Sequence, residues 1–480
     1  MKKLSIRPRR MTVPIAILLC ITLLLSPMSA SAKEAGKYTE LDETIDLMEA
    51  YHLSGVTEEE LIQAAIEGII LSLDDPYTDY YSEDELKAFT DSLNNVYYGT
   101  GIILGELNGA FYVNLVMENT SAEQMGILEG DVIVSVNGIM TRGKTLLDLE
   151  KAEIGANGDT VKLRVRRGSA VLTFNLTYAE VQVPLVTTRW FGDGVGYLRL
   201  HTFSDEAAYE FITELEKLSE KGLQSLIIDL RYNGGGLLSS TEMIARQFLD
   251  NDVLMYTKDK DGKEKKVEVD GHLPLMVPIV VLVNEGTASA SEVLAGALQD
   301  NKLALIVGDQ TFGKGVIQQI IPMHTSGGVL KITVEEYFTP NKHRVHGVGI
   351  TPDIEVAGIS EQLIRALYSA GLTKLNVVIE PSKIKVNGEV LHTQIDILKQ
   401  GQATHLPLRF LAAVVDADLS WNPSTKSVVL TKDQKKISYP LASLTVKNNL
   451  SYIDVKTFQK DFPEFVWNTS SELPTIDVSI

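Results

Sequence analysis

The stretch that decides the fold is PIVVLVNEGTASASEVLAGALQDNKLALIVGDQTFGKG, from Pro278 to Gly315. Two apolar runs, PIVVLV and LALIVG, lie on either side of a segment that we expect to be a helix from Ser289. Continuous apolar runs rich in β-branched residues are typical of strands buried on both faces, and strands that alternate with helices predict a parallel sheet. The same alternation runs through residues 183–356, for which we expect an α/β core.

The end of this stretch, GDQTFGKG at Gly308–Gly315, fits the first part of a nucleotide-binding P-loop. A P-loop also needs a Ser or Thr after the lysine to bind magnesium, and a helix whose N-terminus faces the phosphates. Gly315 stands in the first of these places, and the VIQQIIPM that follows is β-branched and broken by Pro322. The sequence therefore argues against nucleotide binding, and Lys314 needs another role.

A lysine between two glycines can act as a base when the fold buries it, because desolvation disfavours the charged ammonium. A matching nucleophile is Ser289, which lies where the PIVVLV strand gives way to a helix. The amide of Ala290 would then bind an oxyanion, with a second donor from the glycines at 234–236. The alternative interpretation makes Ser289 and Ser291 helix N-caps and the glycines a simple loop.

At this point four segments resemble the carboxyl-terminal processing peptidases, also called tail-specific proteases. They are, in chain order, DLRYNGGG, GTASASEVLAGALQD, VGDQTFGKGVIQQ and GVGITPDIEV, and the resemblance covers residues 38–356. It implies a serine endopeptidase with a crotonase/ClpP-like α/β core, a PDZ domain inserted before that core, and no metal or cofactor. Residue by residue, it makes Ser289 the nucleophile, Lys314 the base and Gln318 the third catalytic residue.

The same resemblance makes Ala290 and Gly235 the oxyanion donors. The glycine loop departs from the family's usual RNNPGG, because Tyr232 and Gly234 stand in place of Asn and Pro. The departure leaves open which glycine amide donates, and the chemistry itself is unaffected.

The segment from Gly99 to Tyr178 resembles a PDZ domain, with GILEGDVIVSVNG as its strand signature. A PDZ domain captures a chain terminus by adding it as a strand, while backbone amides hold the carboxylate. The resemblance implies protein substrates that bind by their C-terminal tails. Thr100 stands where the loop usually has an apolar residue, so the size of the pocket stays open. The carboxylate-binding loop would be Gly99, Thr100, Gly101 and Ile102.

Two rival interpretations remain open. One is a Ser-His-Asp enzyme, although no G-x-S-x-G nucleophile motif is present. The candidate residues for this enzyme are His201, His343, His346, Asp193 and Asp229. For Asp229 we favour a structural ion pair with Arg231 instead.

The other rival is a non-catalytic PDZ adaptor or scaffold of the cell envelope that keeps the core as a binding platform.

Residues 376–480 contain short strands with Asn-Gly and Asn-Pro turns. KVNGEVL and HLPLRFLAAVVDADLSWNPSTKSVVL resemble a small β-rich, stalk-like domain related to the copper amine oxidase N-terminal domain. His392 and His405 lie in it without the spacing of a metal site. We therefore expect no metal, and a role in cell-wall contact or self-association.

The N-terminus has the pattern of a signal peptide removed after Ala32. Five basic residues precede an apolar run of 15 residues, Met11–Leu25, and SPMSASA ends in a small-residue cleavage site. The run is short for a membrane span, which needs about 20 residues, and an uncleaved anchor is the alternative. Cys20 is the only cysteine, so the mature chain would have no disulfides. We expect an exported, extracytoplasmic protein.

The length and composition allow two to four globular domains, and the strand and helix patterns together with the resemblance predict a multi-domain α/β and β protein. A net charge of −19 argues against a nucleic-acid partner, which requires a basic surface. The resemblance adds the expectation of a homodimer formed through the N- and C-terminal segments. The expected segments are a signal peptide at 1–32, N-terminal helices at 33–95, a PDZ domain at 96–182, the peptidase core at 183–356, a connecting helix at 357–375 and the β-rich domain at 376–480.

Overall fold

The structure is a computed structural model. The expected signal peptide lies outside the described residues, and none of the described helices is long and apolar enough to cross a membrane. The described residues are 39–479 without 94–95, 108–109, 118, 129–130, 145–148, 150–157, 168–169, 183, 271–274, 324–327, 381–382, 392, 394, 448–449 and 470–472.

The centre of the molecule is a six-stranded sheet in the order β10-β11-β12-β15-β16-β19. The edge strand β10 is antiparallel to β11, and all other neighbours are parallel. Every residue of β12 and β15 is buried, which explains their continuous apolar sequences. The strands are β10 (Val186–Trp190), β11 (Val195–Leu200), β12 (Ser225–Asp229), β15 (Ile279–Val283), β16 (Ala304–Gly308) and β19 (Ile354–Glu355).

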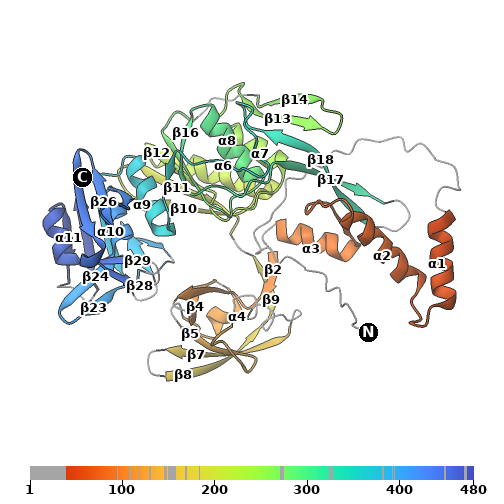
Figure 1. Cartoon of the computed structure of the whole chain (residues 1–480), viewed down its shortest axis with the longest axis horizontal. Helices are drawn as coiled ribbons and strands as arrows, with labels where there is room; N and C mark the ends of the chain where they lie inside the picture. The colour runs from red at the N-terminus through yellow and green to blue at the C-terminus, as the bar shows by residue number, and fades with distance from the viewer. Residues whose placement is uncertain are drawn as a thin grey trace.

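Each face of this sheet belongs to a different hydrophobic core, because successive side chains of a strand point to opposite faces. Leu226 and Ile228 pack with the helices α6 (Asp205–Glu220), α7 (Leu238–Ala245) and α8 (Ala290–Asp300). Ile227, between them in β12, packs with α9 (Ile359–Ser369) and with the C-terminal region. Figure 1 shows α6, α7 and α8 on one side of these strands and α9 on the other.

A second sheet carries part of the N-terminal segment into the core. Its order is β1-β18-β13-β14, with β17 also paired to β18. The N-terminal segment itself contains α1 (Thr39–Tyr51), α2 (Glu58–Leu71) and α3 (Glu83–Leu93), and β1 lies between α2 and α3. The strands of the second sheet are β1 (Asp79–Tyr81), β13 (Val253–Asp259), β14 (Glu264–Glu268), β17 (Val316–Pro322) and β18 (Val329–Phe338).

A separate sheet, in the order β3-β4-β5-β7-β8 with β6 paired to β5, lies between residues 102 and 177. A two-stranded ribbon of β2 (Val96–Gly99) and β9 (Ala179–Gln182) joins it to the rest of the chain (Figure 1). The short helix α4 (Ser121–Gln124) packs against β8. The strands of the sheet are β3 (Ile102–Leu107), β4 (Ala110–Val116), β5 (Val132–Val136), β6 (Ile139–Met140), β7 (Thr160–Arg167) and β8 (Ala170–Thr177).

The C-terminal region consists of three small antiparallel sheets around α10 (Leu408–Val414) and α11 (Val455–Asp461). It shares one hydrophobic core with the second face of the central sheet, so α9 is an integral part of that core. The strands are β20 (Lys374–Ile379), β21 (Ile384–Val386), β22 (Glu389–Leu391), β23 (Leu398–Gln400), β24 (Ala403–Pro407), β25 (Asp418–Asn422), β26 (Ser427–Lys432), β27 (Lys435–Pro440), β28 (Thr445–Lys447), β29 (Leu450–Asp454), β30 (Phe465–Asn468) and β31 (Thr475–Ser479).

Candidate active site

Ser289 lies at the start of α8, after the loop that follows β15. It is fully buried. Its backbone has φ 59° and ψ −118°, which is costly for a residue with a Cβ, and such strain is concentrated at functional sites. The position also places Ser289 at the partly positive N-terminus of a helix. The neighbouring Ser291 has a structural contact, because its hydroxyl donates to the carbonyl of Asn233 at 2.9 Å.

The buried carboxylate of Glu292 connects the start of α8 at Ser289 to the turn that carries Lys314. It accepts the amides of Ser289 at 2.8 Å, Gly313 at 2.7 Å and Lys314 at 2.8 Å. The Thr311 hydroxyl donates to it at 2.5 Å. Burial raises the pKa of the Glu292 carboxyl, and these hydrogen bonds oppose that rise. Sequence reasoning missed Glu292, although Ser289 followed three residues later by a Glu fits a capping box.

Lys314 is completely buried in a turn that only glycine neighbours allow. A Cβ on Gly315 would come within 2.1 Å of the His346 backbone nitrogen, which explains the glycine at that position. The Tyr337 hydroxyl donates to the Lys314 carbonyl at 2.7 Å and lies 3.1 Å from the Ser289 carbonyl oxygen. Glu292 and Tyr337 therefore hold the backbones of the two candidate residues in one buried cluster.

Gln318 lies on β17, four residues after Lys314, and is fully buried. Its amide nitrogen donates to the Thr333 hydroxyl at 3.3 Å. Its carbonyl oxygen is buried and has no hydrogen-bond partner among the described residues, so this oxygen can accept a hydrogen bond from an ammonium. The residues after Lys314 form the strand β17, where a P-loop would have a helix.

The glycine loop after β12 contacts Ser289 directly. Gly235 has φ 102°, and a Cβ on it would lie 2.9 Å from both the Ser289 Cβ and the Ala290 nitrogen. The structure thus brings together the two residues expected to donate to the oxyanion. The Gly235 amide donates to the Asn233 side-chain oxygen at 2.9 Å, so it would have to exchange this partner to bind an oxyanion.

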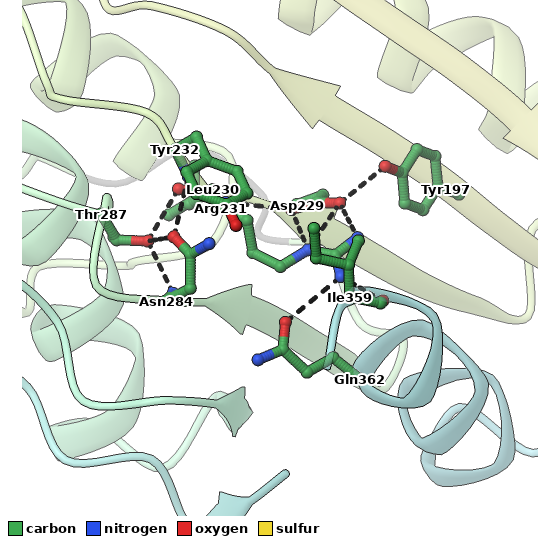
Figure 2. A network of polar contacts seen from close by, with 9 residues as sticks. All are labelled: Tyr197, Asp229, Leu230, Arg231, Tyr232, Asn284, Thr287, Ile359 and Gln362. Atoms are coloured by element: carbon green, nitrogen blue, oxygen red, sulfur yellow. Dashed lines mark hydrogen bonds and ion pairs between the residues drawn. The ribbon is translucent and has the colours of Figure 1, made fainter. Parts of the chain in front are cut away.

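A buried polar network anchors the start of the glycine loop (Figure 2). Arg231 forms an ion pair with Asp229 at 2.6 Å, and the Tyr197 hydroxyl donates to the same carboxylate at 2.7 Å. Arg231 also donates to the Ile359 carbonyl and to Gln362 at the start of α9. Burial acts against ionisation, but Arg231 holds the pKa of Asp229 well below its usual range. The expected structural role of the Asp229–Arg231 pair is confirmed.

The histidines of the rival Ser-His-Asp interpretation have partners elsewhere. His201 lies 3.0 Å from the Thr187 hydroxyl, and burial lowers the pKa of His201 to about 3. His343 is exposed beside Asp300, at 3.8 Å. The ring of His346 packs edge-on against Tyr77. The carboxylate of Asp193 binds Thr373. These contacts, together with the Asp229–Arg231 pair, give no support to a catalytic histidine.

The loop expected to bind a carboxylate connects β2 to β3. Gly99 ends β2 and Ile102 begins β3. The carbonyl of Thr100 accepts the Ala122 amide at 3.0 Å, and that of Gly101 accepts the Met117 amide at 2.9 Å. β3 is an edge strand of the described sheet. An extended chain can add to such an edge.

Within the described part of the chain, no group of three or more His, Cys, Asp or Glu side chains could hold a metal ion. His405 lies on β24, paired with Asp454 of β29. His392 lies outside the described residues. The described His, Cys, Asp and Glu side chains therefore form no candidate metal centre.

Comparisons with known proteins were made for the whole chain. Family models match as Peptidase family S41 at residues 194–356, PDZ domain at 112–167 and Copper amine oxidase N-terminal domain at 385–465. Carboxy-terminal processing protease CtpB of Bacillus subtilis is 30% identical over 87% of this chain and 82% of its own length. CtpA of the same organism is 28% identical over 79% of this chain and 84% of its own. The solved structure of a photosystem II D1 C-terminal processing protease aligns with a TM-score of 0.43 and 31% identity, over 67% of this chain and 87% of that one.

Proposed function

The chain belongs to peptidase family S41, with carboxy-terminal processing proteases as relatives, and on that premise we propose that it cleaves proteins with a Ser289–Lys314 dyad. The family and the domain matches confirm the predicted α/β peptidase core, the PDZ domain and the class of enzyme. The dyad is supported by one observation above all. The Glu292 carboxylate binds the amides of both Ser289 and Lys314 inside a fully buried cluster.

In the proposed reaction the neutral amine of Lys314 takes the hydroxyl proton of Ser289, and the oxygen attacks a peptide carbonyl. The C–N bond then breaks, and the ammonium of Lys314 returns its proton to the leaving amine. A water molecule hydrolyses the acyl-serine ester, releases the new C-terminus and restores the hydroxyl. Complete burial of the lysine supports this role, because desolvation favours the neutral amine that a base requires.

Gln318 and the oxyanion donors complete the proposed machinery. The buried carbonyl oxygen of Gln318 would accept a hydrogen bond from the Lys314 ammonium and fix its direction. The Ala290 amide at the first turn of α8 would bind the oxyanion, and the Gly235 amide would join it after leaving Asn233. One such donor is typically worth about 3 kcal/mol of transition-state stabilisation.

The dyad is tested with an unstructured protein substrate that ends in apolar residues. Ser289→Ala and Lys314→Met should each lower kcat by about a thousandfold or more, because dyad residues act as a unit. Lys331→Met is the matched control, since Lys331 is also a buried lysine but contacts Tyr81. Retained cleavage in both dyad variants would refute the dyad. A wild-type protein that binds the substrate but never cuts it would establish the adaptor interpretation instead.

We also propose that the PDZ domain selects substrates by their C-terminal tails. The free edge of β3, next to the loop Gly99–Ile102, supports this because an added strand would bring its carboxylate to that loop. Amidation of the substrate's C-terminus should raise KM several-fold. A short reporter peptide without a tail tests activation: if adding a free C-terminal peptide leaves its cleavage rate unchanged, PDZ binding only recruits and does not activate.

Export is proposed from the N-terminal pattern of residues 1–32. Sequencing the N-terminus of the protein secreted from its host should give residue 33 as the first residue. Recovery of the uncleaved chain from the membrane fraction would show an anchor instead. Contact of the C-terminal region with the cell wall is a companion proposal, checked by sedimentation with purified wall fragments.

A homodimer through the terminal segments is supported by the apolar surface of α1 and α2. No residue of α2 is buried, and large apolar side chains are exposed along the helical hairpin formed by α1, α2 and the turn between them. Ile69→Glu should convert a dimer into a monomer in light scattering, and Leu419→Glu tests the C-terminal region in the same way. A wild-type chain that is monomeric at high concentration would refute the dimer. The exposed side chains on the hairpin include Leu47, Met48, Tyr51, Leu53, Ile62, Ile69 and Leu71.

A further inference from the structure

The segment DDPYTDYYS, Asp74–Ser82, has no role in the function described so far. It precedes the peptidase core in sequence, yet β1 joins the core's second sheet beside β18. The register pairs Asp79 with Lys331 and Tyr81 with Val329. This pairing brings the residues just before β1 next to the lysine's turn.

We propose that Tyr77 is a positioning residue for Lys314, and that the face of its ring stabilises the positive charge that forms on the amine during proton transfer. The proposal rests on the proposed function, since it gives Lys314 the role of base. The Lys314 Nζ lies 5.0 Å from the centroid of the Tyr77 ring. This distance is within the range in which a cation is attracted to an aromatic face.

Tyr77 is held at its backbone and at its ring. Its backbone amide donates to the Asp75 carboxylate at 2.9 Å. The ring packs edge-on against His346, with centroids 6.3 Å apart and planes at 68°. His346 in turn lies against Gly315, the residue after the lysine. The aromatic face is therefore fixed relative to the turn that carries Lys314.

The next residue of the segment, Thr78, is linked to Gln318 of the proposed site through Thr333. The Thr78 hydroxyl donates to Asp75 at 2.6 Å and accepts the Thr333 amide at 3.1 Å. The Thr333 hydroxyl accepts the amide nitrogen of Gln318 at 3.3 Å. A single short segment thus contacts Lys314 through Tyr77 and Gln318 through Thr78 and Thr333. Both contacts come from outside the core sequence motifs.

The expected contribution follows from when the charge appears. The amine of Lys314 is neutral before reaction and becomes an ammonium as Ser289 attacks. An aromatic face attracts the ammonium more strongly than the amine, so it lowers the barrier without tightening substrate binding. An interaction of this kind is worth about three- to thirtyfold in rate.

The first test compares Tyr77→Phe, which keeps the face, with Tyr77→Leu, which keeps apolar bulk and loses it. Phe should retain kcat within about twofold, and Leu should lower kcat about three- to thirtyfold with KM unchanged. Tyr80→Leu is the matched control, because Tyr80 lies in the same segment and packs on Gly328. A Leu variant at position 77 with wild-type kcat, or a Phe variant as slow as Leu, would overturn the proposal.

The pH profile of kcat/KM separates this role from a merely structural one. Without the aromatic face the ammonium is less stable, so the acid limb of the Tyr77→Leu profile should move to lower pH while its plateau falls. The other titratable groups in contact with Tyr77 or the Lys314 turn include Glu292 from α8, Tyr337 from β18, Asp75 and His346. The profile of His346→Asn is therefore measured alongside, because it shows how much of the acid limb belongs to the imidazole. An unmoved limb would contradict the proposal.

A series that keeps the shape of the ring nearly constant completes the test. Phenylalanine with one, two and three ring fluorines is incorporated at position 77. Each fluorine weakens the negative electrostatic potential of the ring face while the ring keeps nearly the same size. The logarithm of kcat should fall with each fluorine, and a flat series would overturn the proposal. These results are distinct from a failure of the proposed dyad. If the dyad were wrong, the Lys314→Met variant would cleave the substrate as fast as wild type, whatever residue stands at position 77.

Discussion

Two buried carboxylates near the carboxyl ends of neighbouring strands have opposite surroundings. Asp229, at the end of β12, forms an ion pair with Arg231 at 2.6 Å. Glu292, in the helix after β15, accepts three backbone amides and the Thr311 hydroxyl. Arg231 holds the pKa of Asp229 below its usual range despite burial, and burial raises that of Glu292. The charge of Asp229 is balanced by Arg231 in a structural ion pair, whereas Glu292 binds the backbone amides of the two candidate catalytic residues, Ser289 and Lys314.

The largest expected effect comes from breaking the ion pair. Asp229→Ala leaves the Arg231 guanidinium buried without its counter-charge, which typically costs about 3–5 kcal/mol of unfolding free energy. Urea denaturation followed by circular dichroism measures the loss. If the variant is as stable as wild type, Asp229 is not the scaffold carboxylate that the comparison requires.

Glu292→Gln should affect activity more than stability. A glutamine presents one acceptor oxygen to four donors, and its amide group faces donors rather than acceptors. We expect kcat to fall about 10- to 100-fold, equivalent to about 1.4–2.7 kcal/mol, because Ser289 and Lys314 of the proposed dyad lose the carboxylate that binds both of their amides. Steady-state kinetics measure this fall, and the control is Ser360→Ala on α9, whose hydroxyl bonds to Glu361 and not to Glu292. Unchanged kcat would remove Glu292 from the site.

Arg231→Lys sharpens the comparison by keeping the charge and losing the geometry. Lysine cannot reproduce the donors that Arg231 directs at both Asp229 oxygens and at the Ile359 carbonyl. We expect a loss of about 1–2 kcal/mol in thermal or urea unfolding. A loss as large as that of Asp229→Ala would mean that hydrogen-bond geometry, rather than charge, dominates the pair.

The smallest effect is the pH dependence of stability, and its sign differs between the two carboxylates. Asp229 has a lowered folded pKa, so its contribution is present above its unfolded value of about 3.9 and is lost as pH falls below it. Glu292 has a raised folded pKa, so its contribution is present below about 4.3 and is lost as pH rises through the folded value. Melting temperatures between pH 3 and pH 7 should therefore respond oppositely to Asp229→Asn and Glu292→Gln. Parallel curves for the two variants would contradict these assignments.

Sequence motifs locate the residues expected to do chemistry, but not all of those that hold them. Ser289 and Lys314 stand in continuous motifs whose glycines and strand ends indicate their surroundings. Glu292 was visible as part of a capping box, but its contact with the Lys314 turn depends on how α8 packs beside β16. Tyr77 could not be found by motif, because its contact depends on β1 pairing with a strand about 250 residues later.

The fold shows the same division. Runs of β-branched residues predict β12, β15 and β16, because burial on both faces leaves a clear local pattern. What covers each face is a long-range property. The sequence predicts an appended β-rich domain. It does not indicate that the apolar residues of this domain pack with α9 and with one face of the central sheet in a single core.

That shared core has a consequence for biosynthesis. Ile227 and Leu282 of the catalytic sheet pack in the same cluster as Phe465 and Val478, which the ribosome adds last among them. A nascent chain that has already emerged with both Ser289 and Lys314 still has one side of its sheet uncovered. We expect a chain truncated after residue 372, which has only α9 on that side, to be degraded or held by chaperones and to cleave nothing. The order of synthesis would then delay proteolysis until the molecule is nearly finished.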